Sequence, residues 1–175
     1  MLHVPALICL ETPRLILREM TLEDAPTLHA VLGDRETMRW YPRALTLEEV
    51  QEWIARQILR YGSGAGLLGM VLKSTGVLIG DCGLVWLDVE GLEEPEIGYH
   101  VHRDHWSQGF ATEAARAVRS YAFSTLGCGH VISMIRPENL ASRRVAEKNG
   151  LTVDRVVFWR DYEHCVYRVA RADAP

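Results

Sequence analysis

A glycine turn that leads directly into a long amphipathic helix is the feature that most constrains this chain. The segment Trp106–Glu113 reads Trp-Ser-Gln-Gly-Phe-Ala-Thr-Glu. It follows a predicted strand over 95–102 and begins a predicted helix over 112–126. Small residues at Gly109 and Ala111 let backbone N–H groups approach a ligand at the positive end of the helix dipole. Such a turn binds a pyrophosphate; the alternative is that Gly109 is only a loop glycine before a helix.

The other periodic segments place this turn in the middle of a mixed sheet domain. Helices are predicted over 21–33, 46–62 and 139–150, and the second of these begins at a capping box, Thr-Leu-Glu-Glu. The other strands are predicted over 14–20, 66–73, 77–87, 130–136, 152–160 and 164–171. The order contains no internal repeat and predicts one α+β domain over 1–175, with about seven strands, flanking helices and a loosely ordered N-terminal extension over 1–11.

Charge and cysteine usage exclude several classes of protein. The net charge of −4 and a pI near 6.0 argue against nucleic-acid binding and favour a neutral or cationic partner. The four cysteines have no paired spacing, which argues against a zinc ribbon or a disulfide framework. No run is apolar enough to span a bilayer. A cytoplasmic protein without a membrane partner is therefore expected, and its oligomeric state stays open, with a homodimer as one option.

Four segments carry a resemblance that extends over nearly the whole chain. They are Thr12–Arg18 (Thr-Pro-Arg-Leu-Ile-Leu-Arg), Glu96–Tyr99 (Glu-Ile-Gly-Tyr), Trp106–Glu113 and Asn139–Gly150. In this order they resemble the GNAT family of N-acetyltransferases, and in particular its RimJ/RimL-like branch. The resemblance implies a mixed sheet whose fourth and fifth strands splay apart around coenzyme A. It also implies transfer of an acetyl group from acetyl-CoA to an amine, without a metal.

The resemblance also implies which residues bind acetyl-CoA. The backbone of the fourth strand would hydrogen-bond the pantetheine arm, the glycine turn would hold the pyrophosphate, and the late helix would reach the pantetheine amide. The residues are Tyr99, His100 and Val101 for the arm, Ser107, Gln108, Gly109, Phe110, Ala111 and Thr112 for the pyrophosphate, and Asn139 with Ser142 on the helix. Trp106 stands where the general family pattern has Gln or Arg. That departure costs little, because the turn works through main-chain donors.

Two residues are candidates for proton transfer. Attack on the thioester needs a neutral amine, so a group must accept a proton directly or through water. Glu96 is the first candidate, since strand alternation places it on the face of Gly98 and His100; the alternative is a solvated carboxylate at a strand end. Many relatives protonate the departing thiolate with a tyrosine at the position of Ala146. By resemblance Ser142 would substitute for it, although Ser142 also suits a purely structural place in the first helical turn.

The remaining candidates concern metals and the acceptor. His100, His102 and His105 form His-x-His-x-x-His, which allows a zinc site, a base or substrate-lining role for His100, or surface histidines. Trp40 and Tyr41 are expected in a loop at the mouth of the acceptor site, and Trp53 in the core or in the pocket wall. Four acidic residues would form a solvated turn or attract a cationic acceptor: Asp88, Glu90, Glu93 and Glu94.

Three functions from different classes follow from these observations. The first is an acetyl-CoA-dependent N-acetyltransferase that uses direct attack, since no cysteine lies in the cofactor motifs; its acceptor is a protein N-terminus or a small-molecule amine. The second is a degenerate homologue that binds acyl-CoA without turnover. The third is a zinc-dependent hydrolase built on the histidines.

Overall fold

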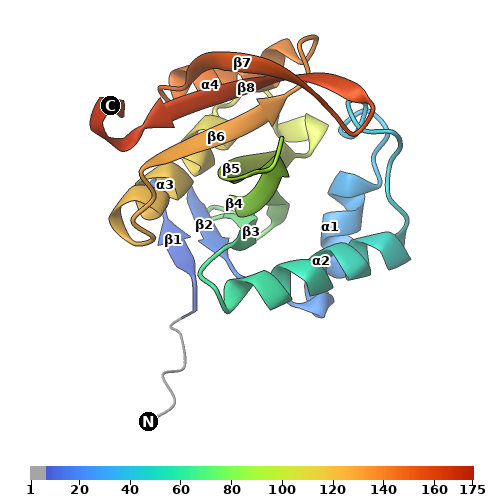
Figure 1. The fold of residues 1–175 in the computed structure, drawn as a ribbon. Coiled ribbons are helices and arrows are strands. Elements are labelled where there is room, and N and C mark those ends of the chain that lie inside the picture. Colours follow the sequence, from blue (N-terminus) through green and yellow to red (C-terminus); the bar gives the residue numbers. More distant parts are fainter. Residues whose placement is uncertain (1–6) are drawn as a thin grey trace.

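The computed structural model describes residues 7–175, which form an eight-stranded sheet flanked by four α-helices (Figure 1). The strands are β1 (Cys9–Glu11), β2 (Leu15–Arg18), β3 (Gly66–Leu72), β4 (Leu78–Val89), β5 (Leu92–Val101), β6 (His130–Ile135), β7 (Thr152–Trp159) and β8 (Tyr162–Ala170). The helices are α1 (Ala25–Leu32), α2 (Leu47–Tyr61), α3 (Phe110–Ser124) and α4 (Leu140–Lys148). Within residues 7–175, no helix combines the length and apolarity needed to cross a lipid bilayer.

The sheet is mixed, as the sequence predicts, but it has one strand more than the seven expected. Its order is β1-β2-β3-β4-β5-β6-β8-β7, and only β5 and β6 run parallel. The additional strand is β1, which lies inside the segment 1–11 that was expected to be a loose extension. It forms because Cys9 pairs with Arg18 and because Ile8 is buried in the main core. Residues 1–6 of that expected extension lie outside the described residues.

Local sequence signals account for the ends of several elements. The side chains and backbones of Thr46 and Glu49 satisfy each other at the start of α2, which confirms the predicted capping box. Glu90 and Gly91 both have positive φ and join β4 to β5 in a two-residue hairpin. This turn is tighter than the acidic turn predicted over 88–94, so β5 begins three residues earlier than expected.

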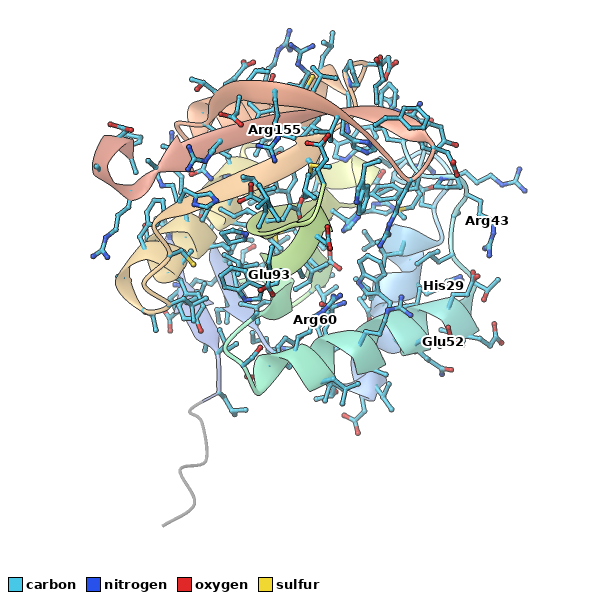
Figure 2. The ribbon with its side chains drawn as sticks, viewed as in Figure 1. His29, Arg43, Glu52, Arg60, Glu93 and Arg155 are labelled. Carbon is cyan, nitrogen blue, oxygen red and sulfur yellow. The ribbon has the colours of Figure 1, made fainter. Side chains whose placement is uncertain are left out.

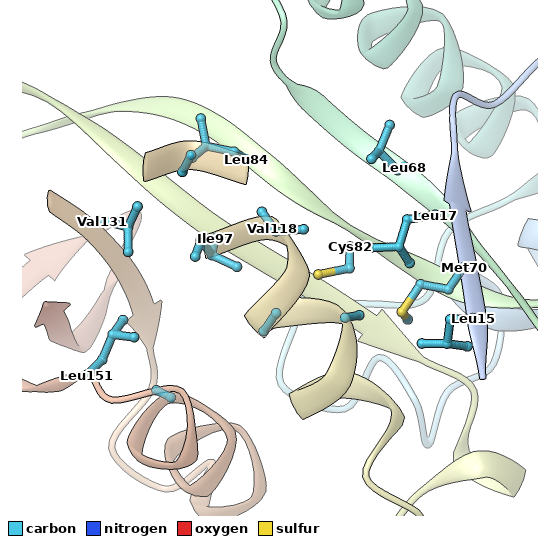
Figure 3. Close-up of a cluster of buried hydrophobic side chains, with 14 of the residues drawn as sticks. Leu15, Leu17, Leu68, Met70, Cys82, Leu84, Ile97, Val118, Val131 and Leu151 are labelled. Atoms are coloured by element: carbon cyan, nitrogen blue, oxygen red, sulfur yellow. The ribbon is translucent and has the colours of Figure 1, made fainter. Parts of the chain in front are cut away.

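The helices cover opposite faces of the sheet and bury separate cores. Figure 3 shows Val118 of α3 against Cys82 and Ile97, in a cluster that also holds Leu15 and Met70. On the other face α1 and α2 bury a second cluster, and β7 and β8 cover a third beside β6. A site between α2 and the sheet is therefore separated from α3 by the thickness of the sheet.

A bulge in β4 decides which side chains face α2. Met70 and Val71 of β3 are opposite Gly80 and Leu78, so Ile79 is an extra residue in the strand. The alternation of faces shifts by one at this point. As a result Asp81 points to the face of α2, while Cys82 points into the core on the α3 side.

Strands β5 and β6 separate soon after they meet. Glu96 and Ile132 form the one backbone pair between them among the described residues. Beyond this pair, the Ser133 hydroxyl donates to the carbonyl of Ile97 at 2.9 Å. The expected splay of the fourth and fifth strands of the predicted fold is thus present, since β1 shifts the numbering by one.

Candidate active site

The glycine turn has the geometry of an anion cradle. Ser107 has a φ of 59° and Gly109 a φ of 82°, and Gly109 is the residue that precedes α3. Two left-handed residues so close together turn successive N–H groups inward at the positive end of the helix. The indole Nε1 of Trp106 donates to the Val101 carbonyl at 2.7 Å. Trp106, the residue that departs from the general family pattern, therefore fastens the turn to β5.

Residues from the N-terminal strands hold the other side of this turn. The Arg14 guanidinium donates to the Gln108 carbonyl at 2.9 Å and lies 4.3 Å from the centre of the Phe110 ring. Its Nε also donates to Glu113 in the first turn of α3, and Thr12 donates to the same carboxylate. The sequence motif at 12–18 is thus a clamp for the turn.

A cavity of about 410 Å³ lies over this turn. Its wall contains Ser107, Gly109, Phe110, Ala111, Thr112, Tyr99, His100, Val101, Asn139 and Ser142, which are all the predicted cofactor residues except Gln108. The side chain of Gln108 turns back to the Asp104 carbonyl instead. Arg39, Arg144 and Lys148 also contribute to the wall, so the cavity suits a ligand with phosphate groups.

A second cavity, of about 590 Å³, lies between α2, β5, β6 and the β7–β8 turn. Glu96 and Trp53 are part of its wall. The two cavities share six residues: Trp40, Tyr41, Tyr99, His100, Asn139 and Ser142. The sequence predicted all six as site residues. A ligand in one cavity can therefore meet a ligand in the other at this shared wall.

A buried chain of polar groups ends at the shared wall. Nδ1 of His100 lies 2.6 Å from an Asp81 carboxylate oxygen, and Nε2 lies 2.7 Å from the Tyr41 hydroxyl. The other Asp81 oxygen accepts from Nε1 of Trp53 at 2.9 Å. Burial alone would lower the pKa of His100, but the charge of Asp81 and the hydrogen bond to it raise that pKa. Burial raises the pKa of Tyr41, so its hydroxyl stays protonated.

Glu96 lies on the face of Gly98 and His100, as strand alternation predicts. A Cβ built on Gly98 would lie 3.1 Å from Oε2 of Glu96. Burial raises the pKa of Glu96 to about 7, and the Met134 backbone and the His100 charge offset only part of this rise. A carboxyl group with such a pKa can both accept and release a proton near neutrality. Glu96 is therefore not a freely solvated strand-end carboxylate.

The start of α4 carries Asn139 and Ser142. Asn139 is the N-cap and its Oδ1 accepts from the Ser142 N–H at 3.2 Å, while the Ser142 carbonyl accepts from the Tyr99 hydroxyl at 2.8 Å. Within residues 7–175 the Ser142 hydroxyl makes no hydrogen bond, and the residue belongs to the wall of both cavities. Ala146 is buried in the core and lies outside both walls.

Two interpretations from the sequence need correction. The zinc hypothesis needs His100 as a ligand, but both of its ring nitrogens have partners in Asp81 and Tyr41. The acidic turn is not uniformly solvated, since Glu94 is buried and pairs with His130 and Arg155. These partners lie far away in the sequence, so the spacing of the histidines and of the acidic residues does not reveal them.

Sequence reasoning missed Asp81 and a group of arginines. Asp81 is the one acidic residue in the apolar run Leu78–Leu87 of β4, and this isolation is the signal that the sequence offers. Arg56, Arg60, Arg136 and Arg160 all contribute to the wall of the second cavity. Their convergence comes from α2, the end of β6 and the β7–β8 turn, and nothing in their local sequence indicates it.

Comparisons with known proteins agree with this geometry. The family model described as an acetyltransferase (GNAT) domain matches residues 14–152. The uncharacterized N-acetyltransferase p20 of Bacillus licheniformis is 33% identical over 160 residues, which is 88% of this chain and 86% of p20. The crystal structure of an acetyltransferase from Agrobacterium tumefaciens str. C58 has a TM-score of 0.81 at 29% identity, covering 95% of this chain and 96% of that one. RimL, a ribosomal L7/L12 α-N-protein acetyltransferase in complex with coenzyme A, shares the fold at 18% identity and a TM-score of 0.77, covering 93% and 98%.

Proposed function

Since this chain belongs to the GNAT family of acetyltransferases, we propose that it transfers the acetyl group of acetyl-CoA to a primary amine by direct attack of that amine on the thioester. The observation that carries the proposal is the meeting of the two cavities at a shared wall. The cavity over the glycine turn would hold acetyl-CoA, and the cavity beside Glu96 would hold the acceptor. The thioester would lie where both are open to each other.

The first cavity fits coenzyme A in shape and charge. Turn N–H groups and the start of α3 suit a pyrophosphate, and Arg144 and Lys148 supply positive charge. The edge of β5 past Glu96 has no backbone pair with β6, so its backbone groups suit the amides of a pantetheine arm. The side chain of Asn139 keeps its amide N–H groups for the same arm, since its cap bond uses Oδ1. When bound, acetyl-CoA supplies the activated acetyl group.

The second cavity supplies the proton acceptor. At neutral pH an alkylamine is largely protonated and must lose a proton before it can attack. Glu96, which has a pKa of about 7 and lines the second cavity, would take that proton, directly or through one water. Asp81 and His100 hold the Tyr41 hydroxyl in the shared wall. That hydroxyl and the hydroxyl of Ser142 are the groups available to donate a proton to the departing thiolate, in place of the missing tyrosine at 146.

The alternative function is a homologue that binds acyl-CoA without turnover, which Ala146 keeps in consideration. Thiol release from acetyl-CoA separates the two. We expect release that depends on an added primary amine, with the acetylated amine identified by mass spectrometry. Tight binding of acetyl-CoA by calorimetry without release, over a panel of small amines and peptides with free N-termini, would establish the alternative instead.

A further inference from the structure

The wall of the acceptor cavity carries an excess of positive charge. Arg56 and Arg60 come from α2, Arg136 follows β6, and Arg160 lies in the β7–β8 turn. Figure 2 shows Arg60 projecting from α2 towards the sheet. Among residues 7–175, Glu96 is the one acidic residue in the same wall. This local charge is opposite to what the net charge of −4 suggests for the whole chain.

Most of this positive charge has no internal partner. Among residues 7–175, Arg56, Arg60 and Arg160 have no carboxylate within 4.0 Å, and Arg136 reaches only the exposed Glu138, at 3.8 Å. Some arginines elsewhere on the fold pair with carboxylates, among them Arg14, Arg18, Arg39, Arg43 and Arg155, while others in the described chain, such as Arg168, do not. What sets the acceptor cavity apart is that three arginines without a carboxylate partner among these residues line the same wall.

The positive charge of Arg60 is disfavoured by its surroundings in this cavity. Its side chain is half-buried, and its guanidinium donates a hydrogen bond to Oε1 of Gln57 at 3.1 Å. Burial and the charges of Arg56 and Arg160 lower the pKa of Arg60. Like charges brought together in a partly desolvated cavity are unfavourable unless an anion joins them.

Aromatic rings lie against the faces of several of these guanidinium groups and leave the in-plane N–H edges uncovered. The Arg160 guanidinium lies 4.1 Å from the centre of the Trp159 ring, and that of Arg136 lies 4.1 Å from the centre of the Tyr162 ring. Arg56 lies over Trp53 at 5.7 Å. Stacking occupies the faces of these groups, whereas their N–H donors lie in the plane. Arg136 already donates to the Trp40 carbonyl at 3.3 Å, but the donors of Arg56 and Arg160 have no acceptor among residues 7–175 and suit a carboxylate or phosphate.

We infer that the acceptor is a small amine that also carries an anionic group, a carboxylate or a phosphate, which Arg56, Arg60 and Arg160 bind while the amine lies beside Glu96. This inference rests on the proposed function. A cavity of about 590 Å³ is of the size that encloses a small molecule. Arg56 and Arg60 follow Trp53 by about one and two turns of α2, so they line the part of the cavity towards the C-terminal end of that helix. One small molecule can contact both these arginines and Glu96, because all three residues line the same cavity.

The test compares amines that differ only in the anionic group. Thiol release is measured with aminocaproate and its neutral amide, and with phosphorylethanolamine and ethanolamine; cadaverine serves as a dication and a short acidic peptide as a macromolecular acceptor. We expect kcat/KM for at least one small anionic amine to exceed that of its neutral counterpart by about tenfold or more, the usual worth of hydrogen bonds to a charged group. Whichever pair shows the preference identifies the anion as carboxylate or phosphate.

Charge-removing variants then assign the preference to these arginines. Arg60→Met and Arg160→Met keep an apolar stem and should reduce the ratio of kcat/KM between anionic and neutral amines towards one, with the KM for acetyl-CoA unchanged. Arg168→Met is the control, because Arg168 is an exposed residue of β8 outside both cavities. This variant should keep the parent's ratio of kcat/KM between anionic and neutral amines. Thermal melts check that each variant folds. If Arg60→Met does not fold, Arg160→Met still provides the test, because Arg160 is exposed and its substitution should not affect folding.

Several results would overturn the inference without touching the proposed function. They are equal or faster turnover of the neutral amines, preference for cadaverine, turnover of the acidic peptide alone, or an unchanged ratio in both arginine variants. If no amine releases thiol, the proposed function fails, and the inference is decided by calorimetry on the enzyme saturated with coenzyme A. Binding of the anionic amines no tighter than of their neutral counterparts would then reject it.

Discussion

Replacing Glu96 with glutamine should stabilise the folded protein while it slows the reaction. The carboxyl group of Glu96 has its pKa raised from 4.5 to about 7 by burial between β5, β6 and α2. Between these two pH values the folded protein keeps a proton that the unfolded chain has released. Stability therefore falls as pH rises through this window, and above pH 7 the full penalty of the buried charge is present. Glutamine has nearly the same shape and carries no charge at any pH.

The size of the effect follows from the difference between the two pKa values. That difference corresponds to about 3 kcal/mol at pH 8, and water in the cavity makes this an upper value. A domain of this length gains roughly 2–4 °C in melting temperature for each kcal/mol. Glu96→Gln should thus melt several degrees above the parent at pH 8, and at pH 5 the difference should shrink to roughly a quarter of that value.

Thermal melts of the ligand-free protein at both pH values provide the measurement, with kcat measured on the same preparations. We expect kcat to fall on the order of 10²-fold, the usual worth of a general base, with little change in the KM for acetyl-CoA. Glu93→Gln, an exposed carboxylate on the same strand, is the matched control and should change neither quantity (Figure 2). Identical melting of Glu96→Gln and parent at pH 8, together with full kcat, would refute the reasoning.

Two further predictions concern the glycine turn and the cysteines. Gly109→Val should weaken acetyl-CoA binding about tenfold or more in calorimetry, because the φ of 82° disfavours any side chain and the added Cβ would lie 3.4 Å from Nη2 of Arg14; unchanged affinity in a folded variant would place the cofactor elsewhere. Mixing the enzyme with acetyl-CoA alone should leave its intact mass unchanged, since Cys82, Cys128 and Cys165 are buried and the exposed Cys9 lies outside both cavity walls. Isolation of an acetylated enzyme that passes its acetyl group to an amine would contradict direct attack.

Signals that act over a few residues were enough to predict most of the fold. The capping box at Thr46 and Glu49 marked the start of α2, and Gly109 marked the turn before α3. β1 was missed because three residues carry too little periodicity, and its pairing with β2 is decided by packing. The acidic run predicts a longer loop than the structure has, because the positive φ of Glu90 and Gly91 closes the hairpin within two residues.

The candidate site likewise contains residues that local sequence predicts and residues that only the folded chain brings together. Residues near the glycine turn could be named because their backbone role follows from the local pattern and from the family resemblance. The partner of His100 could not be named, because Asp81 lies opposite His100 only in the register set by the two-residue turn at Glu90 and Gly91, which the sequence pattern did not predict. The arginines of the acceptor cavity were missed for a similar reason. Arg60 and Arg160 are a hundred residues apart in sequence, and only the folded sheet brings them to one cavity.

The single backbone pair between β5 and β6 gives the ligand-free protein an open strand edge inside its own sheet. Five strands lie on one side of this seam and three on the other. An unpaired edge is a template for strands of other chains, and proteins normally cover such edges. A ligand along β5 would cover this one and would hold both halves of the sheet together. Acetyl-CoA would then stabilise the folded protein as well as serve as its substrate, adding about 2.7 kcal/mol at a concentration one hundred times its Kd. Preparations stripped of it are the ones in which self-association through the seam is expected.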